Sequence, residues 1–164
     1  MRQPLRCGGV LSLDKDDLTA AVDDFEKAIH ADSAYGMAYG AMAAALNRLN
    51  KFDDALRAAE RASSLSPNAW QPYFEMAKSY IAKMDYQRAL QQLTHAKEQM
   101  SNEYPPLHLV RANALLGLKN YNDAANELKT FLKIAPSDPN ASAAQETLGQ
   151  INAFMASRVA APQF

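Results

Sequence analysis

Apolar residues along the chain recur three and four positions apart, which is the spacing of one face of an α-helix. One clear example runs through Leu18, Val22, Phe25 and Ile29. The same helical period returns after short polar breaks along most of the chain. It predicts helices over residues 3–14, 17–31, 36–49, 52–65, 70–83, 86–99, 105–118, 121–134 and 140–157.

The helical pattern repeats at a nearly constant interval. Ala21, Ala55, Ala89 and Ala124 occupy the same place in four successive segments and are separated by 34, 34 and 35 residues. A second series keeps the same steps: Ala28, Ala62, Ala96 and Phe131. A fixed period of this length is typical of stacked helical units. We therefore predict that each unit is a pair of antiparallel helices joined by a tight turn.

Polar residues at the breaks provide candidate helix starts. We expect Asp17, Asp85 and Asn120 each to accept a hydrogen bond from the free N–H groups at the start of a helix. Asn68, followed three residues later by Gln71, has the spacing of a capping box ahead of the helix predicted over 70–83.

The repeat resembles that of the tetratricopeptide-repeat family. In that family the first helix carries a bulky residue, an apolar–small pair and a large residue, the second helix carries alanine-x3-large, and a proline follows. Residues of the second unit that fit this pattern are Tyr39, Met42, Ala43, Leu46, Ala55, Ala62 and Pro67. Those of the third unit are Tyr73, Met76, Ala77, Tyr80, Ala89, Leu93 and Ala96. The resemblance covers about residues 5–136.

Two units depart from the family pattern. The fourth unit places His108 and Arg111 at positions that are normally apolar. The first unit has Gly8, Gly9 and Ser12 in its first helix, where the family has the apolar–small–large framework. Interior glycines cost a helix about 0.8–1 kcal/mol each relative to alanine, so the first helix is expected to be intrinsically weak.

The resemblance implies an all-α fold, a right-handed α-solenoid of about four helix-turn-helix repeats with a C-terminal capping helix. The repeats are expected within residues 1–136, at approximately 2–35, 36–69, 70–104 and 105–138. A capping helix over 139–158 and a tail over 159–164 complete the expected organisation.

Composition narrows the classes of function. The chain has 17 basic and 18 acidic residues and a net charge of −1, whereas a nucleic-acid-binding protein usually carries a basic excess on one face. No apolar run reaches the roughly 18 residues that cross a membrane, and the first residues lack the apolar core of a secretory signal. Cys7 is the only cysteine, so no internal disulfide and no thiolate metal cage is expected.

No catalytic, cofactor-binding or metal site is predicted. His30, His95 and His108 lie in different units and form none of the i,i+3 or i,i+4 pairs that zinc sites on helices use. They are interpreted as ordinary surface or packing histidines. The chain contains no glycine-rich phosphate loop and no nucleophile elbow.

The remaining candidate site is a groove, because in the resembled family the first helices line the concave face. The resemblance implies a partner-binding groove formed by Met37, Ala41, Arg48, Gln71, Phe74, Glu75, Lys78, Leu109, Val110 and Asn113. Its apolar character favours an amphipathic helix or an extended apolar peptide as the guest. Members that bind the acidic tails of chaperones grip a carboxylate with several basic and amide residues. At the corresponding positions of this chain only Arg6, Lys78 and Asn113 are residues of the required basic or amide type, so we exclude binding of chaperone tails.

The leading hypothesis is a non-enzymatic scaffold that binds a protein or peptide partner, without nucleic acid, cofactor or membrane insertion. The alternative is a structural or self-association module that forms the C-terminal part of a larger multidomain protein. In that case a homodimer would form through the degenerate first repeat.

Overall fold

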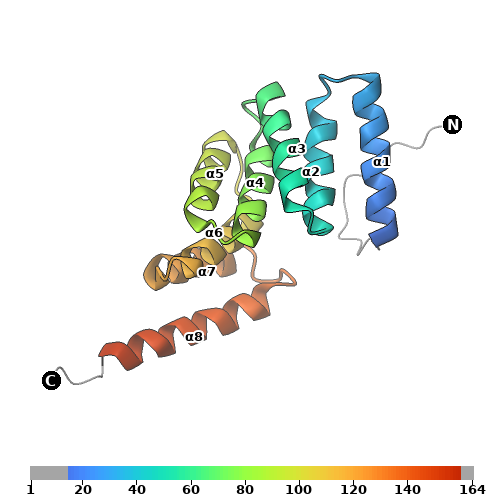
Figure 1. Ribbon diagram of the computed structural model, residues 1–164. Helices are drawn as coiled ribbons and strands as arrows, with labels where there is room; N and C mark the ends of the chain where they lie inside the picture. Colours follow the sequence, from blue (N-terminus) through green and yellow to red (C-terminus); the bar gives the residue numbers. More distant parts are fainter. Residues whose placement is uncertain (1–14, 160–164) are drawn as a thin grey trace.

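The computed structural model describes residues 15–159, except for the side chain of Asp16. Within that range the fold is all-helical (Figure 1). Its helices are α1 (Lys15–Ala31), α2 (Gly36–Arg48), α3 (Phe52–Leu65), α4 (Trp70–Ala82), α5 (Tyr86–Gln99), α6 (Pro105–Gly117), α7 (Tyr121–Ile134) and α8 (Ala141–Val159). They agree with the predicted helices to within two residues at each end. The predicted helix over 3–14 and Cys7 lie outside the described residues.

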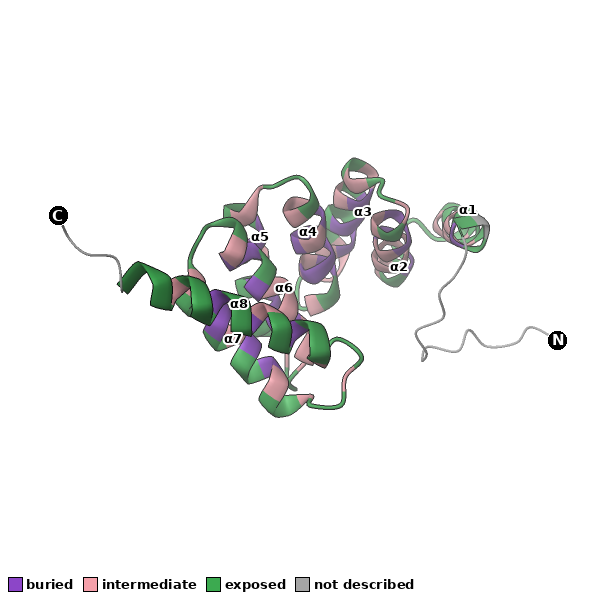
Figure 2. Ribbon diagram, turned by 90° about the horizontal axis from the view of Figure 1, so that it is seen from below, coloured by how far each residue is buried: buried purple, intermediate pink, exposed green. Residues whose placement is uncertain are grey.

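The helices form an α-solenoid, in which each one packs mainly on its neighbours along the chain. The pairs α2–α3, α4–α5 and α6–α7 are helical hairpins, and α2 also contacts α4 while α4 contacts α6. Figure 1 shows the helices placed in chain order from α1 to α8. Three apolar clusters follow one another along this array, and buried residues lie mostly on the faces between adjacent helices (Figure 2).

Small residues allow the helices to approach closely. Alanine fills the tightest positions of both helices in each hairpin, and none of these alanines is more than 1% exposed: Ala43, Ala55, Ala77, Ala89, Ala112 and Ala124. A larger side chain there would have to push two backbones apart, because protein interiors are already close-packed. The regular spacing of these alanines in the sequence is thus the spacing of the helix–helix contacts.

The turn inside each hairpin is a Schellman motif. Between α4 and α5, Met84 has a left-handed φ of 60° and donates its N–H to the carbonyl of Ile81 at 2.9 Å. The next N–H, that of Asp85, donates to the carbonyl of Tyr80 at 2.8 Å. The same bonds and the same positive φ recur at Asn50–Lys51 and at Lys119–Asn120. Three hairpins therefore share one turn, although none of them uses the glycine that this conformation favours.

The predicted helix caps were partly right. Asp85 and Asn120 accept hydrogen bonds from the N–H groups three residues ahead, at 3.2 and 3.4 Å. Asp17 was wrong as a cap, because it lies inside α1. The capping box at Asn68 was wrong as well, because the residue that precedes α4 is Ala69, and no side chain caps the helix.

Helix α8 covers the end of the array. It packs on α7 through Ala144, Leu148 and Ile151, while its opposite face is exposed. Phe154 extends the contact, with its ring 4.9 Å from that of Tyr121. A helix with one apolar stripe closes a solenoid because it buries the last hairpin's apolar face without exposing another.

Candidate functional site

A cleft of about 560 Å³ lies between α2 and α4. It is lined by Gly36, Met37, Gly40, Ala41 and Ala44 of α2, Ala62 and Ser66 at the end of α3, Ala69, Trp70, Gln71, Pro72, Phe74, Glu75 and Lys78 at and after the start of α4, and Tyr104 before α6. The lining is mostly apolar. A volume of this size is in the range of sites that hold ligands in proteins.

The α2 wall of the cleft consists of small residues. A Cβ atom placed on Gly40 would meet no atom within 4 Å, so the space above this part of α2 is open. Gly36 differs, because a Cβ there would lie 3.0 Å from Oγ of Ser66. Gly36 therefore serves the packing of α2 on the end of α3, whereas the packing of the fold does not require a glycine at position 40.

The opposite wall is aromatic. The Trp70 ring lies 4.8 Å from that of Tyr104 and 6.0 Å from that of Phe74, and the Phe74 and Tyr104 rings meet edge to face at 5.4 Å. Burial, together with the negative charge of Glu75, raises the pKa of the Tyr104 hydroxyl. Phe74 is only 6% exposed, so it supports this wall from beneath.

One polar network borders the cleft. Glu75 is buried, and its carboxylate accepts a hydrogen bond from Nδ2 of Asn47 at 2.9 Å and pairs with Nζ of Lys78 at 2.8 Å. Ser79 completes the network by donating to Oδ1 of Asn47. The Lys78 ammonium also lies 5.2 Å from the centre of the Phe74 ring. The charge of Glu75 is therefore compensated within the protein, and the cleft is left as a mainly apolar surface.

The predicted groove residues divide into two groups. Those that line the cleft are Met37, Ala41, Gln71, Phe74, Glu75 and Lys78. Those that do not line it are Arg48, Leu109, Val110 and Asn113. Leu109 instead packs against the buried cluster formed by α6, α7 and α8, and Val110 against the cluster formed by α4, α5 and α6.

Sequence reasoning missed Trp70 and Tyr104, which form the aromatic wall. Both lie at a helix start, outside the pattern positions on which the groove was predicted. Aromatic residues with a polar edge are common in binding surfaces, and that composition was the available signal.

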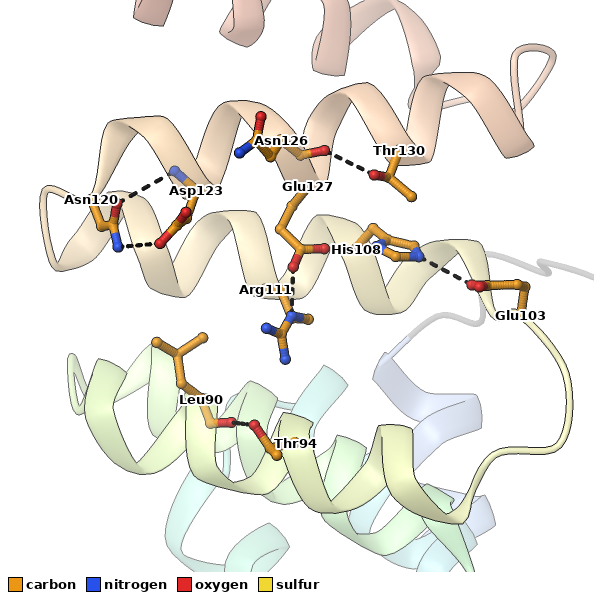
Figure 3. Close-up of polar contacts among 10 residues, drawn as sticks. All are labelled: Leu90, Thr94, Glu103, His108, Arg111, Asn120, Asp123, Asn126, Glu127 and Thr130. Carbon is orange, nitrogen blue, oxygen red and sulfur yellow. Dashed lines mark hydrogen bonds and ion pairs between the residues drawn. The ribbon is translucent and has the colours of Figure 1, made fainter.

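A second polar cluster lies between α6 and α7, at the two positions where the family pattern has apolar residues (Figure 3). His108 is buried, with Nδ1 2.7 Å from Oε2 of Glu127 and Nε2 3.2 Å from Oε2 of Glu103. Arg111 donates from Nε to the other oxygen of Glu127 at 2.7 Å. Burial opposes ionisation of Glu127, but the bonds and charges of His108 and Arg111 outweigh it and lower its pKa.

The described part of the chain holds no candidate metal site and no candidate membrane-spanning helix. Over residues 15–159 no group of three or more histidine, cysteine or acidic side chains is arranged to hold a metal ion. No helix in the same range is both long and apolar enough to cross a membrane.

Part of the chain matches a known protein family. Residues 80–148 match the sequence pattern of the tetratricopeptide repeat. Over this segment the chain is similar to tetratricopeptide-repeat proteins. Members of this family are protein-interaction modules and generally non-catalytic scaffolds. No curated protein matches the chain.

Solved structures of tetratricopeptide-repeat proteins share the fold of this chain. MamA is 14% identical with a TM-score of 0.74, over 87% of this chain and 81% of MamA. YrrB, described as a tetratricopeptide-repeat protein with an unusual peptide-binding site, is 22% identical with a TM-score of 0.70, over 79% of this chain and 65% of YrrB. The Arabidopsis OM64 repeat domain is 20% identical with a TM-score of 0.63, over 69% of this chain and 93% of that domain.

Proposed function

We propose that this protein is a non-catalytic scaffold that binds a peptide or helix of a partner protein in the cleft between α2 and α4. The observation that carries the proposal is the pairing of a small-residue wall with an aromatic wall around about 560 Å³ of open space. The small residues leave room for another backbone to approach, and aromatic side chains supply most of the energy in many interfaces.

The glycine at position 40 supports this interpretation. A glycine inside a helix costs about 1 kcal/mol relative to alanine. Nothing in the fold requires it, since a side chain at Gly40 would point into empty space. Close approach of an occupant to the α2 backbone explains why the position is left bare.

The proposal can be tested with a substitution that fills the cleft without disturbing the core. Gly40→Leu places a side chain in the open space and should retain the helical content of the parent, with a thermal midpoint that is no lower. Gly149→Leu is the matched control, because Gly149 lies inside α8 and outside the cleft, and a Cβ added there would likewise meet no atom within 4 Å.

Peptides selected from a displayed random library on the parent protein supply the ligand for this comparison. We expect their affinity to fall at least tenfold, or about 1.4 kcal/mol, on Gly40→Leu and to stay unchanged on Gly149→Leu. Selected peptides that bind both variants equally would show that the cleft is not the binding site.

The alternative proposal is self-association through the first repeat. Its residues 1–14 lie outside the described part of the chain, so the test is a measurement in solution. Light scattering that gives a dimer, which is lost when residues 1–14 are removed, would favour this function over the scaffold.

A further inference from the structure

His108 lies between two carboxylates that belong to different segments (Figure 3). Glu127 comes from α7 and faces Nδ1, whereas Glu103 comes from the linker 100–104 between α5 and α6 and faces Nε2. The His108 side chain is only 4% exposed, so water does not compete freely for either ring nitrogen. The imidazole therefore connects the linker to the α6–α7 hairpin.

The number of protons on His108 determines how many of these contacts are hydrogen bonds. A neutral imidazole has one N–H, so one of its nitrogens must present a lone pair to a carboxylate oxygen. Only the protonated ring donates to both Glu103 and Glu127. Imidazoles commonly change between these two forms within pH 5–8.

The two carboxylates differ in how easily their side chains can move away from the His108 ring. Glu127 is 18% exposed and is also held by Arg111, so it remains in place when the ring is neutral. The Glu103 side chain is 67% exposed and can turn into water at little cost. Loss of the proton therefore releases Glu103 and leaves the His108–Glu127 bond intact.

Release of Glu103 affects the cleft through the next residue. Tyr104 follows Glu103 directly and forms part of the aromatic wall with Trp70 and Phe74. The backbone of Glu103 thus joins the proton-sensitive contact to the wall of the candidate binding site.

We propose that His108 is a proton-controlled latch: when protonated it holds the linker 100–104 through Glu103 and fixes Tyr104 against the cleft, and when neutral it frees both. The charged groups around the ring are Glu103 from the linker, Glu127 from α7 and, through Glu127, Arg111 of α6 itself. Lys97 of α5 lines the small cavity that Glu103 also lines. An effect on partner binding rests on the proposed function, whereas the latch itself does not.

Two probes in the same chain test the latch without any partner. His30→Gln and His95→Gln together leave His108 as the only histidine, and its ring can then be titrated by NMR. Trp70 is the only tryptophan, and its ring lies against that of Tyr104, so its fluorescence reports on the cleft wall. We expect Trp70 emission to change with a midpoint equal to that of the His108 titration.

Glu103→Gln is the decisive variant, because an amide can accept a hydrogen bond from the protonated ring and donate one to the neutral ring. The pH-dependent change at Trp70 should vanish in Glu103→Gln while His108 still titrates. Glu98→Gln is the matched control, since Glu98 is an exposed glutamate on α5 beside His95, and the Trp70 transition should persist in it. A Trp70 signal that stays flat across the His108 titration, or one that persists in Glu103→Gln, overturns the latch. Neither result bears on whether peptides bind the cleft.

Discussion

Removal of the Glu127 carboxylate tests the energetic role of the cluster between α6 and α7. Glu127 accepts hydrogen bonds from His108 and Arg111, both at 2.7 Å, and all three side chains are mostly buried. Breaking a buried ion pair by deleting one partner costs about 3–5 kcal/mol, because the remaining charge is left unpaired. The partial exposure of Arg111 places Glu127→Ala near the lower end, at about 3 kcal/mol.

Replacing the whole cluster should cost much less than removing one member. The family pattern has apolar residues at positions 108 and 111, and a joint change of His108→Leu, Arg111→Met and Glu127→Met removes every desolvated charge together. Well-packed apolar replacements of buried ion pairs are often neutral or stabilising. We therefore expect the triple variant to be close to the parent in stability, and clearly above Glu127→Ala.

Urea unfolding followed by far-UV circular dichroism measures both variants. With slopes of about 1–3 kcal/mol per molar urea, a loss of about 3 kcal/mol lowers the midpoint by roughly 1–3 M. A triple variant as unstable as Glu127→Ala would refute the reasoning, because it would show that the ionic cluster itself stabilises the α6–α7 hairpin.

The contribution of the Glu127 carboxylate to stability should depend on pH. Burial opposes ionisation of Glu127, but His108 and Arg111 more than offset it, so its pKa lies below the ordinary glutamate value of about 4.3. A carboxyl whose pKa is lowered by folding adds stability above its unfolded pKa and loses it as the pH falls through the folded pKa. The stability difference between the parent and Glu127→Gln should therefore shrink below about pH 4. A constant difference would contradict this account.

Four further substitutions test the packing and the turns. Gly117→Ala should destabilise the protein by about 1–3 kcal/mol, because the added Cβ would collide with the ring of Tyr86. Gly149→Ala should stabilise it by up to about 1 kcal/mol, because the added Cβ there would lie in open space. Thermal melts of the two variants measure this difference. Met84→Gly should raise the urea midpoint, since Met84 is 76% exposed and its left-handed φ of 60° costs a non-glycine residue about 1–2 kcal/mol; an unchanged or lower midpoint would contradict this. Ala89→Leu should cost about 1–3 kcal/mol through overpacking at a fully buried contact between α4 and α5, and an unchanged thermal midpoint would count against that contact.

The sequence by itself determined the helices, their pairing into hairpins and the positions of closest contact. The helices and hairpins follow from residues near one another in the chain, namely the apolar period of three and four and the polar residue after the turn. The positions of closest contact follow from the alanine that recurs every 34 or 35 residues. Asp85 and Asn120 were predictable as caps because a cap bonds to an N–H only three residues away. Six of the groove residues implied by the family resemblance line the cleft, because in that family the first helix of each unit, here α2 and α4, lines the concave face.

Tertiary structure alone decided which of those surfaces meet. Trp70 joins Tyr104 across 34 residues, and His108 meets Glu127 across 19, through contacts that no local spacing encodes. Leu109 and Val110 fit the groove pattern equally well, but the packing of α6 directs them toward apolar clusters. Local periodicity specifies which face of a helix is apolar, whereas the neighbour that covers this face depends on how successive hairpins stack.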